Sequence, residues 1–245
     1  MRFVIFSDVH ANLTALDAVL ADAESRRPDA YVCLGDVVGY GPDPNECVAR
    51  VRALGAETVA GNHDRAAVGE IDLDTFTALA RTAIEWTQQV LAPDARSWLA
   101  ALPARLNAHG WLAVHGSPRD PISEYIFDLP TALANFAAAE FSRCFVGHTH
   151  VPAMFVLERD GGIAEAALPA GSPVRLRPDA RYLVNVGSVG QPRDGDPRAA
   201  YLVLDQDDGQ TMTLERIAYS VAFTQAKMAA TGLPPLLAER LSFGR

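Results

Sequence analysis

Five of the six histidines in this 245-residue chain stand in short polar segments that follow apolar runs. These five are His10, His63, His115, His148 and His150. Asp8, Asp36 and Asn62 stand in segments of the same kind, and none of the segments contains a cysteine. Imidazoles, carboxylates and one amide oxygen suit Mn, Fe, Zn, Co or Ni better than a structural zinc cage or a calcium site. The sequence therefore predicts a transition-metal site, with manganese or iron favoured.

Seven residues in these segments are potential metal ligands, which is too many for one ion but fits two ions that share a carboxylate. The seven are Asp8, His10, Asp36, Asn62, His115, His148 and His150. A two-ion site activates water and holds the oxygens of an in-line displacement at phosphorus. His63 is then free to protonate the leaving oxygen, and we expect Asp64 to orient it. The residue types predict metal-assisted hydrolysis of a phosphate ester.

Each polar segment lies where a predicted strand ends. The first three strands are expected at about 2–7, 30–34 and 58–60, with helices at 13–20 and 45–54 between them. Three βα units in succession favour a parallel sheet with right-handed crossovers. Open α/β sheets bind ligands at the carboxyl ends of their strands, so we expect the polar segments to meet there.

Residue spacing adds an expectation about side-chain direction. Asp8 and His10 are two residues apart, and so are His148 and His150. Side chains two apart on an extended strand point the same way, so each pair is expected to face one side. An alternative stays open for the first turn, in which Asp8 or Asn12 only caps the following helix.

Two later strands repeat the arrangement. The apolar run at 111–114 ends before His115, and the run at 143–146 ends shortly before His148. A helix is predicted at 130–140 between them.

The segment at 65–110 has a different character. No strand pattern occurs before about Ala104, and an amphipathic helix is expected to begin at Asp72 or Asp74, followed by a shorter helix at 97–102. We interpret the segment as a helical insertion beside the sheet. Whether it contacts substrate or consists of ordinary crossover helices stays open.

The last third of the chain is dominated by strand patterns. Strands are predicted at 154–157, 163–168, 182–186, 200–204 and 212–217. The turn sequences Asp160-Gly161-Gly162 and Asp207-Asp208-Gly209 separate some of them, so we expect a mainly antiparallel second sheet. A final helix is expected at 219–231.

The bulk properties limit the classes of protein. A chain of 245 residues can bury a sizeable core, and we predict one domain over 1–245 that contains the insertion. The formal net charge of -9 argues against long nucleic acid as a partner and leaves a small phosphate ester as the expected substrate. No apolar run reaches the length of a membrane helix or signal peptide, so we expect a soluble, cytoplasmic protein with no membrane partner.

Taken together, the motifs resemble the series found in the calcineurin-like metallophosphoesterases. In chain order they are Asp8-x-His10, Gly35-Asp36, Gly61-Asn62-His63-Asp64, His115-Gly116 and Gly147-His148-x-His150. The resemblance covers residues 1 to about 205. The segments 7–10, 35–42 and 185–193 are similar to the small bacterial and archaeal phosphodiesterase branch, which includes diadenosine tetraphosphate hydrolases.

The resemblance implies a fold and a division of the ligands. The fold is α/β, with two packed mixed β-sheets flanked by helices in four αββα layers. One metal would be held by Asp8, His10, Asp36 and His150, and the other by Asp36, Asn62, His115 and His148. The resemblance also implies that Asp36 bridges the ions, that a bridging hydroxide attacks phosphorus in line, and that His63 protonates the leaving group.

Two positions depart from the family pattern. Ala11 stands where the branch commonly has glycine, which affects the local backbone fit. Ser117 follows His115-Gly116 where many members have another histidine, which puts substrate contacts there in doubt.

Two further residues are predicted as substrate contacts. They are Asn12 and Arg193. The glycines of the 185–193 loop permit close backbone approach, and Arg193 can meet an anion, although a plain turn is the alternative.

The leading hypothesis is a dinuclear metal-dependent phosphoesterase acting on a small phosphodiester or a dinucleoside polyphosphate. A phosphoprotein or phosphomonoester phosphatase would use the same core and differ in the groove around it. A catalytically silent scaffold module of the kind found in the retromer coat is a third hypothesis. It would be expected to lose ligands or the catalytic histidine, whereas this sequence keeps them all.

Overall fold

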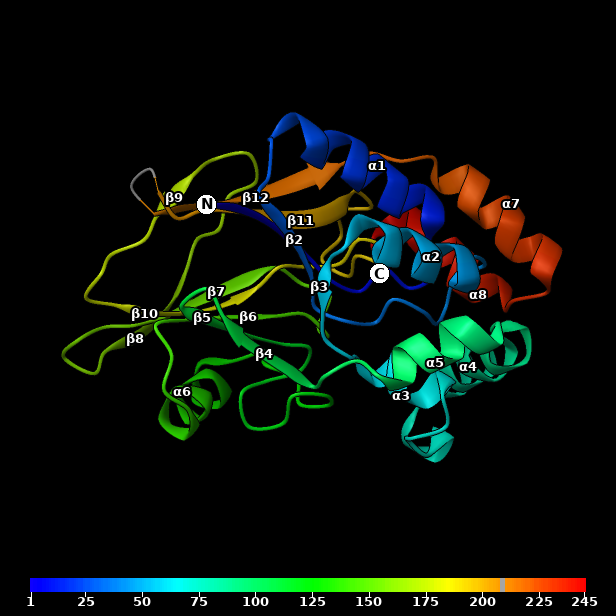
Figure 1. Ribbon diagram of the computed structural model, residues 1–245, viewed down its shortest axis with the longest axis horizontal. Coiled ribbons are helices and arrows are strands. Elements are labelled where there is room, and N and C mark those ends of the chain that lie inside the picture. Colours follow the sequence, from blue (N-terminus) through cyan, green and yellow to red (C-terminus); the bar gives the residue numbers. More distant parts are fainter. Residues whose placement is uncertain (208–209) are drawn as a thin grey trace.

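Two mixed six-stranded β-sheets pack face to face at the centre of the molecule, with helices on their outer sides (Figure 1). The computed structural model describes residues 1–207 and 210–245. The core between the sheets contains side chains from both, including Phe3 and Ile5 from one sheet and Phe145 from the other. This confirms the predicted α/β architecture of two mixed sheets flanked by helices.

The first sheet joins the start of the chain to its last strands. Its strands are β1 (Arg2–Phe6), β2 (Ala30–Cys33), β3 (Glu57–Thr58), β9 (Val174–Arg175), β11 (Ala199–Asp205) and β12 (Thr211–Ile217). Their order is β3-β2-β1-β11-β12-β9. The first three strands of the chain run parallel, as predicted, and β11 pairs antiparallel with β1.

The second sheet contains the middle strands of the chain. They are β4 (Arg105–Ala108), β5 (Trp111–Val114), β6 (Arg143–Val146), β7 (Ala153–Leu157), β8 (Ile163–Ala166) and β10 (Arg181–Asn185). Their order is β4-β5-β6-β10-β7-β8, in which β5, β6 and β10 run parallel. Gly161, with φ +89°, lies in the turn that joins the β7–β8 hairpin, as the sequence predicted.

The predicted mainly antiparallel sheet after residue 152 is wrong. Strands β7, β8 and β10 belong to the second sheet, and β9, β11 and β12 complete the first. The physical reason is that each group of parallel strands leaves an open edge of unpaired backbone groups. Strand β11 pairs along β1, and β10 pairs along β6. The predicted turn at Asp207-Asp208-Gly209 lies partly outside the described residues.

The helices cover both outer faces and one end of the sheets. They are α1 (Leu13–Ser25), α2 (Pro44–Leu54), α3 (Asn62–Ala67), α4 (Ala78–Val90), α5 (Pro93–Ala100), α6 (Leu129–Ala138), α7 (Val221–Thr231) and α8 (Pro235–Glu239), with 3₁₀ turns η1 (Leu73–Thr75) and η2 (Arg240–Phe243). Figure 1 shows α1, α2 and α7 beside the first sheet, α6 beside the second, and α3, α4 and α5 grouped at the lower right.

The helical character predicted between β3 and β4 is present, but the helix boundaries differ. The helix expected from Asp72 or Asp74 is interrupted, because Phe76 is extended and separates η1 from α4. Thr77 caps α4 by accepting a hydrogen bond from Ala80 N. The next helix begins at Pro93 rather than at 97, with proline in the first helical turn, where its missing N–H costs nothing.

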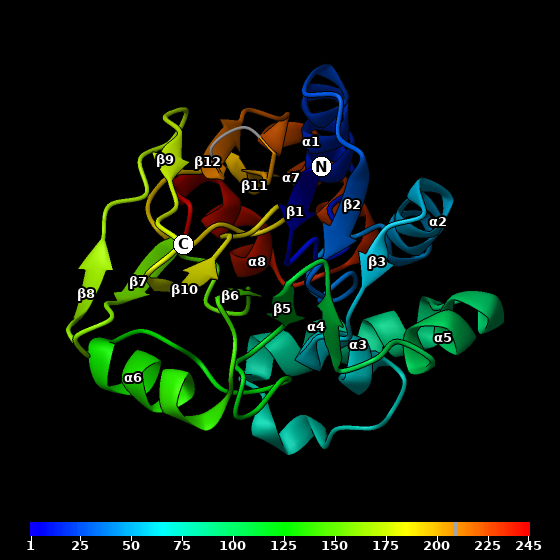
Figure 2. The ribbon, with the colours of Figure 1, turned by 60° about the vertical axis from the view of Figure 1, so that its left-hand side comes forward.

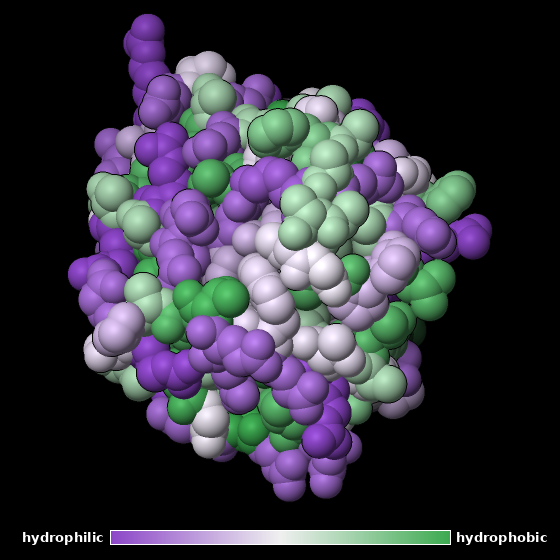
Figure 3. All heavy atoms as spheres, turned by 90° about the vertical axis from the view of Figure 1, so that its right-hand side faces the viewer, coloured by the Kyte–Doolittle hydropathy of each residue, from purple (hydrophilic) through white to green (hydrophobic). Residues whose placement is uncertain are grey.

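The C-terminal helices return to the helical group through a separate apolar cluster. Met228, Leu237 and Leu241 pack with Ala80 and Ala83 of α4, and Tyr40 belongs to the same cluster. Figure 2 shows the red C-terminal segment behind the strand ends of both sheets. On the face seen in Figure 3, hydrophilic and hydrophobic residues are interspersed. The C-terminal segment thus packs against α4 and against the loop after β2 that carries Tyr40.

Within residues 1–207 and 210–245, no helix combines the length and apolar character needed to cross a bilayer.

Candidate metal centre

The seven predicted ligands converge in the interior, at the ends of β1, β2, β5 and β6 and at the start of α3. Every one of them is buried, with Asn62 the most exposed at 9%. Burial of so many carboxylates and imidazoles is costly unless a counter-charge or an ion compensates. The expectation that strand-end segments meet at one site therefore agrees with the described geometry.

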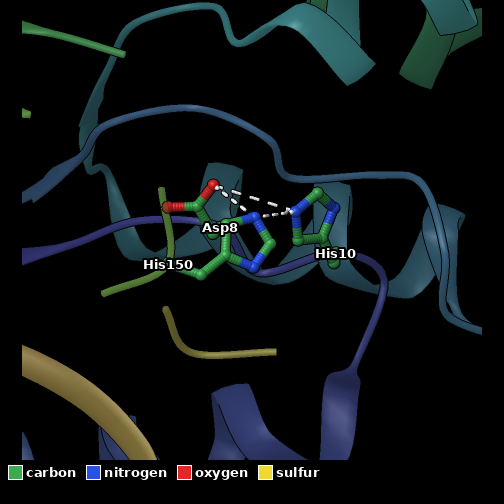
Figure 4. A group of neighbouring side chains, drawn as sticks. All are labelled: Asp8, His10 and His150. Carbon is green, nitrogen blue, oxygen red and sulfur yellow. Dashed lines mark hydrogen bonds and ion pairs between the residues drawn. The ribbon is translucent and has the colours of Figure 1, made fainter. Parts of the chain in front are cut away.

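The first group consists of Asp8, His10 and His150 (Figure 4). The Nε2 atoms of His10 and His150 lie 3.1 Å apart, and Asp8 Oδ1 lies 3.3 Å from His150 Nε2. Asp8 Oδ2 accepts a hydrogen bond from His148 N. Asp8 Oδ1 is buried and has no hydrogen-bond partner among the residues that the structure describes. An acceptor oxygen facing two imidazole nitrogens is suited to a cation.

The second group consists of Asp36, His115 and His148, with Asn62 beside them. His115 Nε2 lies 3.1 Å from His148 Nδ1, 3.1 Å from Asn62 Oδ1 and 3.4 Å from Asp36 Oδ2. Four potential donor atoms therefore meet in a small buried volume. Their types, two nitrogens and two oxygens, fit a borderline transition-metal ion.

Asp36 faces both groups. Its Oδ2 lies 3.4 Å from His115 Nε2 and 3.6 Å from His10 Nε2. Its Oδ1 accepts a hydrogen bond from His63 N at 2.8 Å, which fixes the plane of the carboxylate. A side chain at Gly61 would place its Cβ 2.1 Å from Asp36 Oδ1, so glycine is required there. Asp36 is the geometric centre of the site.

Backbone carbonyls orient the four histidines of the two groups. The ring nitrogens turned away from the centre lie 2.6 to 3.2 Å from these oxygens, in the pairs His10 Nδ1–Val38 O, His115 Nδ1–Leu34 O, His148 Nε2–Ser123 O and His150 Nδ1–Gln191 O. Donation to a carbonyl fixes the proton on the outer nitrogen and leaves the inner nitrogen as a lone pair. This arrangement is typical of imidazoles that bind metals.

The residue spacing correctly predicted that Asp8 and His10 lie together, since both belong to the first group, but it was wrong for His148 and His150. Asp8, His10, Asp36, His148 and His150 all have positive φ, between 48° and 67°. Such residues are not extended, so the two-residue strand period does not apply to them. His148 enters the second group and His150 the first, rather than facing one side together. Left-handed residues of this kind collect at functional sites.

Charge within the cluster is unevenly distributed. Burial raises the pKa of Asp8 to about 7. Burial would also raise the pKa of Asp36, but the imidazoles of His115 and His63 hold it well below its usual range. Burial opposes protonation of His115, yet Asp36 raises its pKa to about 9. Burial lowers the pKa of His148 to about 3. The donor set therefore fits divalent cations. Such ions would take the place of protons on these residues and compensate the negative charge of the buried carboxylates.

His63 lies beside both groups, and its surroundings are aromatic. Its ring centroid is 4.5 Å from that of Tyr40, 4.8 Å from that of His10 and 5.2 Å from that of Phe76. A Cβ at Gly39 would lie 2.4 Å from His63 Nδ1, so the chain needs glycine there for the ring to fit. Ring packing and the hydrogen bond from His63 N to Asp36 fix the position of His63, and ligand atoms of His10, Asp36 and His63 lie within 4.8 Å of one another.

Asp64, which the sequence predicted to orient His63, makes no hydrogen bond to the His63 ring. Asp64 accepts from Gly61 N at 3.0 Å and from Val38 N at 3.2 Å. His63 Nδ1 is buried without a hydrogen-bond partner in the described part of the chain. Asp64 is the third residue of α3, and its carboxylate caps the start of that helix. It therefore holds the backbone that carries His63 instead of contacting the ring.

The two predicted substrate residues lie in different surroundings. Asn12 is 1% exposed and caps α1, with Oδ1 accepting from Ala15 N and Thr224 Oγ1 and Nδ2 donating to Gly190 O. This is the helix-cap alternative, and Asn12 does not line the cavity described below. Arg193 lines the cavity described below, and its guanidinium lies 5.7 Å from the centre of the Tyr40 ring.

The two departures from the family pattern have local explanations. Ala11 has φ +51°, a conformation that glycine adopts more easily. Ser117 is buried, donates to Glu124 and accepts from Asp120 N at 3.0 Å. It stabilises the loop between β5 and α6.

A cavity of about 370 Å³ opens beside the cluster. Asn62, His63, His148 and Arg193 contribute polar groups to its lining. Its other lining residues include three aromatic side chains that the sequence interpretation missed, namely Tyr40, Phe76 and Tyr125. Tyr40 carried a signal, because glycines flank it in the polar segment after β2. Phe76 and Tyr125 carried none, since they belong to loops whose course depends on tertiary packing.

Comparisons with known proteins agree with this geometry. The family model for the calcineurin-like phosphoesterase superfamily domain matches residues 1–209. The crystal structure of a metallophosphoesterase from Sphaerobacter thermophilus is 46% identical, covers 100% of this chain and 99% of its own, and superposes with a TM-score of 0.88. An uncharacterized protein of Methanocaldococcus jannaschii is 38% identical over 98% of this chain and 97% of its own length.

A more distant structure shares the fold. The crystal structure of a hypothetical protein from Pyrococcus horikoshii OT3 is 20% identical, covers 100% of this chain and 98% of its own, and has a TM-score of 0.81. The family match covers all seven predicted ligands, the whole second sheet and every strand of the first sheet except β12. The chain belongs to the calcineurin-like phosphoesterase superfamily and is a metal-dependent phosphoric ester hydrolase.

Proposed function

We propose that the protein is a dinuclear metal-dependent phosphoesterase that hydrolyses a small phosphodiester or a dinucleoside polyphosphate. The observation that carries the proposal is the position of Asp36 Oδ2, which lies within 3.6 Å of an imidazole nitrogen from each ligand group. One carboxylate between two donor sets is the arrangement needed for a shared ligand. The first ion would take Asp8, His10, Asp36 and His150, and the second Asp36, Asn62, His115 and His148.

The metals would supply an activated water and neutralise charge at phosphorus, with manganese or iron favoured. The chain's own residues bind and orient the ester. Arg193 contributes a guanidinium at the cavity, where it can donate to a phosphoryl oxygen. Gln191 Oε1 accepts from Arg193 Nη2 at 2.8 Å, while Arg193 Nε is buried without a partner among the described residues. That free donor supports a role in holding an anion.

His63 is the proposed acid for the leaving oxygen. Burial, opposed by Asp36 and assisted by Arg193, lowers its pKa to about 4. The ring is therefore neutral at pH 7 in the substrate-free protein. A phosphoryl oxyanion beside the ring would raise this pKa, because an opposite charge favours the protonated imidazole. The proposal thus requires His63 to gain its proton together with the substrate.

The cavity supports a small substrate. Its volume of about 370 Å³ lies near the lower end of the usual range for small-molecule sites. The net charge of -9 also disfavours long nucleic acid. A substrate panel with added manganese tests the proposal, using bis-p-nitrophenyl phosphate, p-nitrophenyl phosphate, cyclic nucleotides and dinucleoside polyphosphates.

The panel also separates the alternatives. Faster turnover of the diester or of a dinucleoside polyphosphate supports the proposal, whereas a preference for the monoester would favour a phosphomonoester or phosphoprotein phosphatase. A protein that binds no metal and turns over none of these compounds would be a silent interaction module.

A further inference from the structure

We propose that the cavity beside the ligand groups is a subsite for a planar, nucleoside-sized part of the ester, recognised by the rings of Phe76 and Tyr125. This inference rests on the proposed function and deepens it by specifying the substrate's organic group. It names two residues that come from separate segments, one between η1 and α4 and the other between β5 and α6.

The first observation is that each ring is held against a histidine of the site. Tyr125 stacks on His148, with ring centroids 3.7 Å apart and planes inclined by 18°. Phe76 packs edge-on against His63 at 5.2 Å, inclined by 78°. Both rings therefore lie directly beside histidines of the proposed site. A group attached to the reacting phosphorus would meet aromatic carbon immediately.

The second observation is how polar and apolar groups share the lining. His63, His148 and Arg193 can meet the phosphoryl oxygens, whereas Phe76, Tyr125 and the aliphatic Ile71 and Ala80 offer apolar surface. The uncharged hydroxyls of Thr75, Thr77 and Ser123 complete the polar part of the lining. No carboxylate from the described part of the chain lines the cavity. A ligand with an anionic end and a flat, weakly polar end matches this distribution. Planar rings gain from stacking on aromatic side chains without requiring a particular hydrogen-bond pattern.

The third observation is size. A volume of about 370 Å³ accommodates one compact organic group rather than a long chain. For a dinucleoside polyphosphate, one nucleoside would occupy the cavity and the other would lie outside. Tyr125 is 45% exposed, so its outer edge remains accessible to a ligand that enters.

The test compares the binding of two ligands that differ only in the ring. Thymidine 5′-monophosphate and 2-deoxyribose 5-phosphate carry the same sugar and phosphate, and calorimetric titration gives Kd for each with the manganese-loaded protein. Wild type should bind the nucleotide about tenfold more tightly, the size of one base-stacking interaction. Phe76→Ala and Tyr125→Ala should each bring the ratio toward one, and Tyr125→Phe should restore it.

The matched control is Phe223→Ala. Phe223 lies on α7, is 58% exposed and is not part of the cavity lining, so the ratio should stay unchanged. Manganese content is measured for every variant because Tyr125 contacts His148. Equal affinities in wild type, or a ratio that both alanine variants leave intact, would overturn the inference. Turnover of bis-p-nitrophenyl phosphate is measured separately, and its absence would instead reject the proposed function.

Discussion

The ligand groups and the cavity wall are built in different ways. Every proposed ligand is buried and follows a strand or begins a helix, and each side chain except that of Asn62 has a backbone partner. Phe76 and Tyr125, in contrast, lie on segments between elements, and Tyr125 is 45% exposed. The sheet framework thus sets the chemistry, while the connecting segments can alter the choice of substrate. Changes to the ligand groups should abolish activity, whereas changes to the cavity wall should alter which substrates are preferred.

The largest effect is expected at the point shared by both ligand groups. Asp36→Asn preserves the side-chain volume but weakens the oxygen that faces both His10 and His115. The variant should lose at least one metal equivalent and nearly all turnover, measured by plasma mass spectrometry and a diester assay. Asp17→Asn, which changes an exposed aspartate on α1, is the control. Full metal content in Asp36→Asn would refute the shared-ligand role.

His63→Ala should give the next largest effect and should separate chemistry from metal binding. We expect turnover to fall about 10²-fold or more while the metal content stays at the wild-type value. His109→Ala is the matched control, because His109 lies in the β4–β5 turn and contacts Glu57. If His63→Ala kept wild-type turnover, His63 would not be the acid.

Asp64→Ala tests the revised role of its carboxylate. The substitution leaves Gly61 N and Val38 N without their acceptor in the interior, which should lower the free energy of unfolding by roughly 1–3 kcal/mol. Turnover per folded molecule should fall far less than in His63→Ala. Chemical denaturation measures the stability, with Asp74→Ala at an exposed site as the control. A turnover loss equal to that of His63→Ala, at unchanged stability, would restore the direct orienting role.

The smallest effect concerns the loop that carries Tyr125. Burial would raise the pKa of Glu124, but hydrogen bonds from Arg119, Ser117 and Asn135 lower it to about 2. Because the folded pKa is depressed, this stabilisation is present above the unfolded value of about 4.5 and is lost as pH falls toward 2. The stability difference between wild type and Glu124→Gln should shrink across that window. A difference that does not vary with pH would contradict the assignment.

The same two regions differ in how far the sequence predicted them. Strand-end positions of Asp8, Asp36 and His115 followed from apolar runs and turn residues, because local pattern and global fold agree there. The pairing of β10 and β11 did not, since a strand pattern does not say which open edge it will join. Nor did the direction of His148 and His150, which depends on left-handed backbone that a period of two cannot represent.

The role of Asp64 shows a related limit. Adjacent residues at positions 63 and 64 suggested an acid and its partner, but helix geometry turns neighbouring side chains away from each other. At the start of α3, the backbone N–H of Gly61 donates its hydrogen bond to the Asp64 carboxylate. Phe76 and Tyr125 lie in loops without periodic pattern, so only tertiary packing brings them to one cavity.

The most direct test of the central claim uses protein loaded with manganese. The number of Mn²⁺ ions per chain and the electron paramagnetic resonance spectrum are measured on the same sample. Two ions that share Asp36 should give two Mn²⁺ per chain and a spectrum of exchange-coupled ions. One ion per chain, or two with the spectra of isolated Mn²⁺, would contradict a centre joined through Asp36.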